Sequence, residues 1–232
     1  MKNKKYNTNE IQKFYSNNRN KWSQLYKSEK EILKKLKIKK NSKILDIGSA
    51  CGGLGKILWQ KYKTKNYVGL EINKEASMYS KKIFKKGIYQ NIDLLNYEKK
   101  NFFLSQYDFV FSLGCVDWNT ELDKMLVKAW MHVKIGGYLI LTLRFVNVQK
   151  IKPSFQYINF NKSKKGEKAK YHILNFKKFK SKIKNFKVKN FISYGYWAKP
   201  NITTVTEYKK IFFAGLAIQK DEKNSIIISK FF

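Results

Sequence analysis

The sequence has 232 residues, of which 43% are hydrophobic and 16% aromatic. This is enough to bury the core of one domain, and it excludes a natively disordered chain. The formal net charge is +33, from 49 Lys and Arg against 16 Asp and Glu. Such a charge predicts attraction to polyanions and peripheral contact with anionic surfaces.

The basic residues are almost all lysines, since Arg19 and Arg144 are the only arginines. Arginine is the residue that reads phosphates by bidentate contact, so its scarcity makes nucleic-acid binding the less favoured interpretation. An AT-rich coding sequence would explain lysine in place of arginine, but not the shortage of acids. The charge is therefore compatible with an anionic small substrate, with a nucleic acid or with solubility alone.

The two cysteines, Cys51 and Cys115, provide neither a disulfide framework nor a metal-ligand cluster. The basic N-terminal residues are not followed by the apolar core of a signal peptide. No apolar run approaches the ~20 residues that a membrane-spanning helix needs. We therefore expect a cytoplasmic protein without a resident metal.

The segment Lys43–Leu58, KILDIGSACGGLGKIL, has the pattern of a nucleotide-type binding element. A short apolar run predicts a strand, a loop with four glycines follows, and an apolar helical pattern begins at Leu54. Bare backbone lets a ligand approach closely, and the start of a helix offers free N–H groups. This segment therefore predicts where a cofactor binds.

Strands and helices alternate on both sides of this element. Residues 9–40 carry two helical patterns, which predict an N-terminal cap. The expected elements after the glycine loop are strand Tyr67–Ile72, helix Lys74–Lys86, strand Gly87–Asp93, strand Tyr107–Ser112, helix Glu121–Val133 capped by Thr120, turn Ile135–Gly137 and strand Tyr138–Arg144. This alternation predicts a Rossmann-like α/β fold, with a seven-stranded, mostly parallel sheet and helices on both faces.

After the fifth expected strand, Tyr138–Arg144, strands and helices no longer alternate regularly. Residues 145–185 predict an insertion on the substrate side, with a long polar loop and a basic helix from Phe176 to Ile183 capped by Asn175. Residues 186–232 predict the closing strands. We expect one domain over residues 1–232, made of the cap (9–40), a cofactor-binding core (43–144), the insertion and the closing strands.

Two acids narrow the choice of cofactor. Glu71 ends the second expected strand, where a carboxylate suits the two hydroxyls of a ribose. A nicotinamide dinucleotide and S-adenosylmethionine both contain that ribose. Asp46 lies two residues before Gly48, where it would repel a pyrophosphate but not the amino group and sulfonium of S-adenosylmethionine. The acids therefore favour S-adenosylmethionine.

The segments ILDIGSACGGLG, VGLEIN, NIDLLN, YDFVFSLGCVDWN and VKIGGYLILTLRF occur in that order. Together they resemble a class I S-adenosylmethionine-dependent methyltransferase of the small-molecule type, from about Lys43 to Arg144. The resemblance implies S-adenosylmethionine as cofactor and S-adenosylhomocysteine as product. It places the methionine part of the cofactor on the first glycine loop and the ribose on Glu71, with Ile72 against the adenine. The residues implied for the cofactor are Asp46, Gly48, Ala50, Gly52, Glu71, Ile72, Asp93, Ser112 and Gly114.

Ala50 departs from the family pattern, which usually has a second glycine there. A methyl group at this position is compatible with close approach to the cofactor only if the backbone φ is negative. The contact of this residue with the cofactor carboxylate therefore depends on a negative φ at Ala50.

The acceptor side is predicted from the loops after the fourth and fifth strands. Methyl transfer from a sulfonium requires alignment and sometimes a base for the acceptor's proton. We expect Asp117 or His172 to act as that base or to orient an acceptor hydroxyl, and Arg144 to meet an anionic group. The other residues expected to bind the substrate are Trp118, Asn119 and Tyr171.

Three functions remain open. The first is methyl transfer to a small, anionic acceptor, such as a hydroxyl of a phosphorylated, nucleotide-linked or glycan substrate. The second is methylation of RNA or another nucleic acid, which the charge and the interleaved aromatics favour. Against it, the loop SLGCVDWN lacks the Asn/Asp-Pro-Pro-aromatic motif of amino-methylating enzymes of nucleic acids. The third is a non-catalytic, cofactor-binding docking protein.

Overall fold

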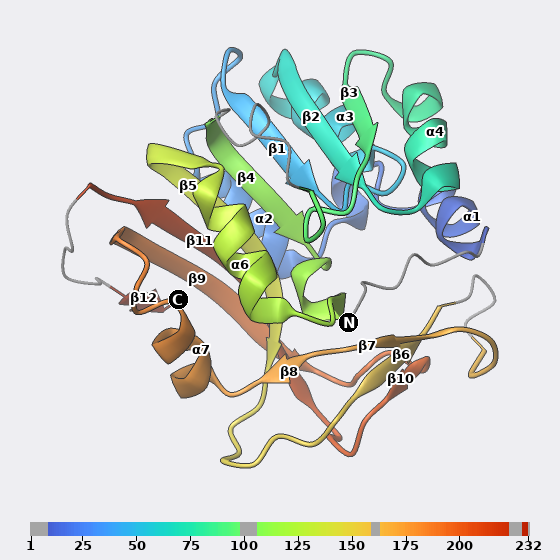
Figure 1. Ribbon diagram of the computed structural model, residues 1–232, viewed down its shortest axis with the longest axis vertical. Coiled ribbons are helices and arrows are strands. Elements are labelled where there is room, and N and C mark those ends of the chain that lie inside the picture. The colour runs from blue at the N-terminus through green and yellow to red at the C-terminus, as the bar shows by residue number, and fades with distance from the viewer. Residues whose placement is uncertain (1–8, 98–105, 159–162, 223–228, 232) are drawn as a thin grey trace.

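The computed structural model describes residues 9–97, 106–158, 163–222 and 229–231 (Figure 1). Its helices are α1 Glu10–Asn17, α2 Lys27–Lys35, α3 Gly53–Tyr62, α4 Lys74–Ile83, α6 Leu122–Met131 and α7 Phe176–Lys182, with single 3-10 turns η1 Trp22–Gln24 and η2 Val116–Trp118. The strands of the main sheet are β1 Lys43–Ile47, β2 Asn66–Glu71, β3 Ile88–Asn91, β4 Tyr107–Leu113, β5 Val133–Phe145, β8 Ile173–Leu174, β9 Val188–Ala198, β11 Ile211–Lys220 and β12 Ser229–Phe231. The strands of a second, small sheet are β6 Phe155–Tyr157, β7 Lys168–Lys170 and β10 Thr204–Val205.

The predicted fold is confirmed. Within the described residues, seven strands form the body of the main sheet in the order β3-β2-β1-β4-β5-β11-β9. β11 runs antiparallel to both of its neighbours, β5 and β9, whereas the pairs from β3 to β5 are all parallel. The short strands β8 and β12 add to this body, beside β5 and β9 respectively.

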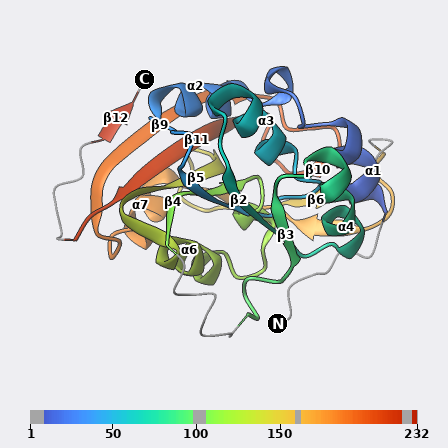
Figure 2. The same cartoon turned by 90° about the horizontal axis from the view of Figure 1, so that it is seen from above.

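Helices cover both faces because the central strands are apolar on both sides. Successive side chains of a strand point to opposite faces. Ile44 and Phe109 accordingly pack with α2 and α3, whereas Leu45 and Val110 pack with α6. Figure 2 shows the resulting layers from above, with α2 and α3 on one side of the sheet and α6 on the other.

Several predicted boundaries change. β5 begins at Val133, so the expected turn at residues 135–137 lies inside a strand, beside an irregularity in the pairing with β4. Thr120 does not cap α6, because Glu121 occupies the N-cap position and the Thr120 hydroxyl is buried without a partner among the described residues. Asn175 does cap α7, since its side chain accepts a hydrogen bond from the Lys178 N–H.

The small sheet was not predicted. Part of the long polar stretch after β5 folds into the β6–β7 hairpin, and β10 joins it from the connection between β9 and β11. In Figure 1 this sheet lies below the main sheet, facing the carboxyl ends of its parallel strands. It therefore faces the edge where the predicted cofactor residues lie.

The N-terminal cap is present as α1, η1 and α2. α2 packs closely on β11 because Gly215 has no side chain: a Cβ there would lie 2.7 Å from the Ser28 carbonyl oxygen of the helix. None of the helices in the described part of the chain has the length and apolar character needed to cross a bilayer.

We predict that Gly215→Ala lowers the free energy of unfolding by about 1–3 kcal/mol, because the added methyl group overpacks the contact between α2 and β11. Urea unfolding followed by circular dichroism measures this change. Lys34→Ala, on the exposed side of α2, is the control and should change stability by at most about 0.5 kcal/mol. Equal stability of Gly215→Ala and the unchanged protein would contradict the close packing.

Candidate active site

The carboxyl ends of the parallel strands open into one cavity of about 800 Å³. Its wall includes the glycine loop after β1 and the residues that follow β2, β3 and β4. α1 and the small sheet provide the remaining sides, through residues such as Phe14, Tyr15, Gln156 and Tyr157. The N-terminal cap and the insertion thus enclose the edge of the sheet at which ligands of open α/β sheets bind.

The glycine loop has a left-handed backbone at three positions. Gly48, Ala50 and Gly52 have φ values of +74°, +46° and +75°. The condition of a negative φ at Ala50 is therefore not met. Its conformation is held by two hydrogen bonds: its N–H donates to Glu71 Oε2 over 2.8 Å, and its carbonyl accepts from the Ser80 hydroxyl over 2.9 Å.

Glu71 lines the cavity at the end of β2 and is buried. It accepts hydrogen bonds from the Ala50 and Asn73 N–H groups, each over 2.8 Å. A carboxylate has about four acceptor sites, so these two bonds leave capacity for the ribose hydroxyls that the resemblance implies. Burial raises the pKa of Glu71, and the backbone N–H donors oppose this.

Asp46, the penultimate residue of β1, also lines the cavity. The Tyr67 hydroxyl donates to its Oδ2 over 2.5 Å. Burial raises the pKa of Asp46 to about 7, although the bond from Tyr67 lowers it. A nearby positive charge would stabilise the ionised carboxylate.

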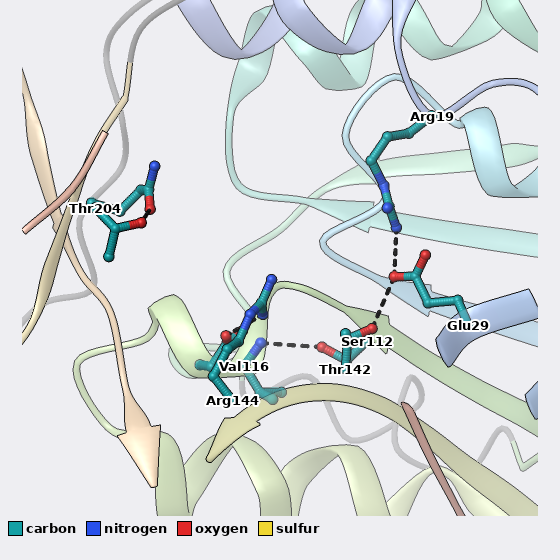
Figure 3. Close-up of polar contacts among 9 residues, drawn as sticks. Arg19, Glu29, Ser112, Val116, Thr142, Arg144 and Thr204 are labelled. Carbon is teal, nitrogen blue, oxygen red and sulfur yellow. Dashed lines mark hydrogen bonds and ion pairs between the residues drawn. The ribbon is translucent and has the colours of Figure 1, made fainter. Parts of the chain in front are cut away.

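Most of the other residues implied for the cofactor also line the cavity, namely Gly48, Ala50, Ile72, Asp93 and Gly114. Ser112 and Gly52 do not appear in its wall, which corrects their expected contact. The Ser112 hydroxyl accepts from the Val116 N–H at the start of η2 (Figure 3), so it shapes the loop from behind. Gly52 is the N-cap of α3, and a Cβ on it would lie 2.5 Å from the Tyr89 hydroxyl oxygen.

The residues present fit S-adenosylmethionine. Ser49 lines the cavity, and its buried hydroxyl has no partner among the described residues, so a polar group of a ligand would satisfy it. The carboxylate of Asp46 suits the positive charge of the cofactor, and the carboxylate of Glu71 can accept hydrogen bonds from the ribose hydroxyls. Ile72, Ile92 and Leu94 provide an apolar surface for the adenine beside Asp93. Among the described residues, no group of three or more His, Cys, Asp and Glu side chains is placed to hold a metal ion.

Arg144 lines the other part of the cavity, as predicted for contact with the acceptor. Its Nη1 forms a buried ion pair with Asp117 Oδ2, and its guanidinium lies 5.2 Å from the ring centroid of Tyr171. Gly114 lies beside the guanidinium and has a φ of +70°, a conformation that favours glycine. Trp118, Asn119 and Tyr171 share this wall, in agreement with their expected location.

Neither predicted base faces the cavity. Asp117 is 0% exposed, forms the pair with Arg144 and is absent from the wall, so its carboxylate positions Arg144 and does not reach an acceptor. His172 is also absent from the wall. Its Nε2–H donates to the Asn119 carbonyl over 2.8 Å, and burial lowers its pKa although this bond opposes the shift. These contacts hold the loop after β4 in place.

Other residues of the cavity were missed in the sequence. Arg19 follows α1, and its Nη2 donates to Glu29 Oε1 over 2.8 Å; this carboxylate also accepts from the Thr142 hydroxyl over 3.0 Å (Figure 3). The remaining members are largely aromatic: Tyr15, Tyr26, Tyr196 and Phe213. The sequence could have indicated Arg19, because an arginine in a lysine-rich chain suggests a site that needs the planar, bidentate guanidinium group.

Comparisons with known proteins agree with this geometry. The family model described as FtsJ-like methyltransferase matches residues 26–217. A structure of phosphoethanolamine N-methyltransferase 2 from Haemonchus contortus, with phosphomonomethylethanolamine and S-adenosylhomocysteine, is similar at a TM-score of 0.59 and 14% identity. The alignment covers 83% of this chain and 52% of that one, so the chain spans about half the length of this relative. The YcgJ protein of Bacillus subtilis is similar at a TM-score of 0.60 and 9% identity, covering 84% and 98% of the two chains. No curated protein matches the sequence.

The sheet order, the glycine loop and the two acids define a class I S-adenosylmethionine-dependent methyltransferase. Since the family model covers most of the sequence, the chain belongs to the FtsJ-like methyltransferase family.

We predict that Ala50→Gly raises the free energy of unfolding by about 1 kcal/mol, because an L-residue in the left-handed region costs ~1–2 kcal/mol and part of this gain is offset in the unfolded chain. Thermal unfolding should show a Tm higher by about 2–4 °C for a protein of this size. The control is Gly52→Ala, which should lower the Tm. A lower Tm for Ala50→Gly would contradict the left-handed conformation.

We predict that affinity for S-adenosylmethionine falls by up to about tenfold per pH unit below pH 7, because the positively charged cofactor favours ionised Asp46, whose pKa in the free protein is about 7. Tyr67 hydrogen-bonds this carboxylate, Glu71 and Glu29 raise its pKa, and Arg19 lowers it. Titration calorimetry at several pH values measures the affinity and the proton released. Asp46→Asn should flatten the pH dependence; an unchanged slope would contradict the assignment to Asp46.

Proposed function

We propose that the protein transfers the methyl group of S-adenosylmethionine to a small-molecule acceptor held beside Arg144. The observation that carries this proposal is the continuity of the cavity: the cofactor loop and the aromatic wall around Arg144 line the same space of about 800 Å³. A small acceptor inside this cavity would lie next to the methyl donor. The surrounding walls would limit the acceptor's orientations.

S-adenosylmethionine, when bound, would supply a methyl group on a sulfonium, with neutral S-adenosylhomocysteine as the leaving group. Because neither Asp117 nor His172 lines the cavity, the proton of an acceptor hydroxyl would pass to water at its open side. The contribution of this chain is mainly alignment of the acceptor. Arg144 is fixed for that task by Asp117 and by the rings of Tyr171 and Phe213, the latter 5.7 Å from its guanidinium. Rings packed against a guanidinium restrict its rotation and leave its N–H groups as the polar contacts.

The proposed acceptor is a hydroxyl of a phosphorylated, nucleotide-linked or glycan molecule. Polar groups of the small sheet support a ligand of this kind. Gln156 lines the cavity, and its amide is oriented by Thr203 and Thr204 on the adjoining segment. A fixed amide of known orientation offers directional hydrogen bonds to hydroxyl groups.

The second candidate function is methylation of RNA, which the net charge of +33 favours. An RNA strand would have to enter the cavity, whose sides include residues of α1 and of the small sheet. Binding of RNA to a lysine-rich surface weakens steeply with salt, whereas turnover of a small acceptor changes little.

The test supplies labelled S-adenosylmethionine to the protein with a metabolite extract and, separately, with total RNA. We expect label in the small-molecule fraction, with little change between low and moderate salt. Label in RNA that is removed by ribonuclease would contradict the proposal. Binding of S-adenosylhomocysteine without label in either fraction would instead favour a docking protein.

A pair of variants localises the acceptor. Ala198 lines the cavity near the end of β9, so Ala198→Trp should fill the acceptor space and lower kcat/KM by at least about tenfold, equivalent to about 1.4 kcal/mol. Lys189→Trp adds the same ring at an exposed position of β9 and should leave kcat/KM unchanged. Both should bind S-adenosylhomocysteine normally. Equal activity of the two variants would place the acceptor elsewhere.

A further inference from the structure

We propose that Arg19 and Arg144 together form a binding site for a phosphate group of the acceptor. The inference rests on the proposed function and names the chemical class of its substrate. Arg19 belongs to the segment after α1 and Arg144 to β5, and both line the same cavity. Figure 3 shows that they come from opposite sides of the site.

A continuous series of rings links the two guanidinium groups. That of Arg19 lies 4.9 Å from the ring centroid of Tyr26, and that of Arg144 lies 5.7 Å from the ring centroid of Phe213. The Tyr26 and Phe213 centroids are 6.2 Å apart. Tyr196, which also lines the cavity, stacks on Phe213 with the ring centroids 5.8 Å apart. The two guanidinium groups therefore lie beside the same pair of neighbouring rings, in the wall of one cavity.

A buried carboxylate fixes one edge of each guanidinium. Glu29 holds Arg19, and Asp117 holds Arg144; the exposed fractions of these acids are 2% and 0%. Neither acid lines the cavity, so both approach from behind. Each carboxylate thereby orients its guanidinium group and leaves other N–H groups of that guanidinium for a ligand.

Two of those N–H groups lack a partner. Arg144 is 4% exposed, and its Nε has no hydrogen-bond partner among the described residues; the same holds for the buried Nη1 of Arg19. A buried donor without an acceptor is costly, and a charged donor more so. An anion between the two arginines would satisfy both groups.

Both arginines stay protonated in this site. Burial alone would lower the pKa of Arg19, but Glu29 reverses the effect and the net shift is upward. The same balance applies to Arg144, whose pKa burial would lower and Asp117 raises. The backbone of Arg19 is held as well, with a φ of +61° and its carbonyl against Gly53, where a Cβ would lie 2.3 Å from that oxygen.

Phosphate matches this arrangement better than a carboxylate does. A phosphate monoester carries close to two negative charges and three oxygens, enough for two forks approaching from different sides. A carboxylate has one charge and two oxygens, which one fork satisfies. The choice of arginine at these two positions alone, in a chain with 49 basic residues, also indicates a demand that lysine does not meet.

The test measures binding of inorganic phosphate to the full chain saturated with S-adenosylhomocysteine, by titration calorimetry. We expect one phosphate per chain, bound at least about tenfold more weakly by Arg19→Lys and by Arg144→Lys, which keep the charge but lose the fork. The control, Lys34→Gln with Lys124→Gln, removes two exposed charges and should change the affinity by less than about twofold.

Three results would overturn the site: equal phosphate affinity in the Arg→Lys variants, equal loss in the lysine control, or displacement of phosphate by acetate at equal concentration. Normal binding of S-adenosylhomocysteine shows that each variant is folded. If Arg144→Lys fails to fold, Arg19→Lys decides the result, because the Arg19 side chain is 17% exposed and tolerates change more readily. Failure of the unchanged protein to bind S-adenosylhomocysteine would contradict the proposed function itself.

Discussion

The carboxylate of Glu29 connects the parts of this structure that form the site. One oxygen accepts from Arg19 and Thr142, and the other accepts from the Tyr26 N–H at the start of α2. This buried group therefore ties the N-terminal cap to the sheet and to a cavity residue. Removing one partner of a buried ion pair costs about 3–5 kcal/mol, because the other charge is left uncompensated. This connection holds the segment after α1 at the cavity, while α1 itself packs against α4.

A second buried pair, Arg144 with Asp117, repeats the arrangement on the opposite wall. In both pairs the acid lies behind the cation, so the cavity presents guanidinium groups and aromatic rings, while the acids at the cofactor edge are Asp46 and Glu71. Asp93 also lines that edge, and Arg19 lies close enough to Asp46 to lower its pKa. Carboxylates and guanidinium groups therefore share one cavity, which suits a cationic cofactor beside an acceptor with an anionic group.

The fold and the cofactor side could be predicted because their signals are local. Alternating apolar runs set the sheet, and Asp46, Gly48 and Glu71 are placed by the ends of β1 and β2. The acceptor side depends on contacts between distant segments: Arg19 meets Glu29, and β10 pairs with β6 across almost fifty residues.

Asp117 was misassigned as a base because the sequence places it after β4 but does not show that Arg144 covers its carboxylate. At Ala50, two hydrogen bonds from other elements override the local preference for negative φ.

A crystal structure with S-adenosylhomocysteine and inorganic phosphate would test most directly whether one cavity holds the cofactor and the acceptor together. We expect S-adenosylhomocysteine against the glycine loop and Glu71, and phosphate between Arg19 and Arg144 in the same space. Cofactor bound outside this cavity, or phosphate bound only to surface lysines, would contradict it.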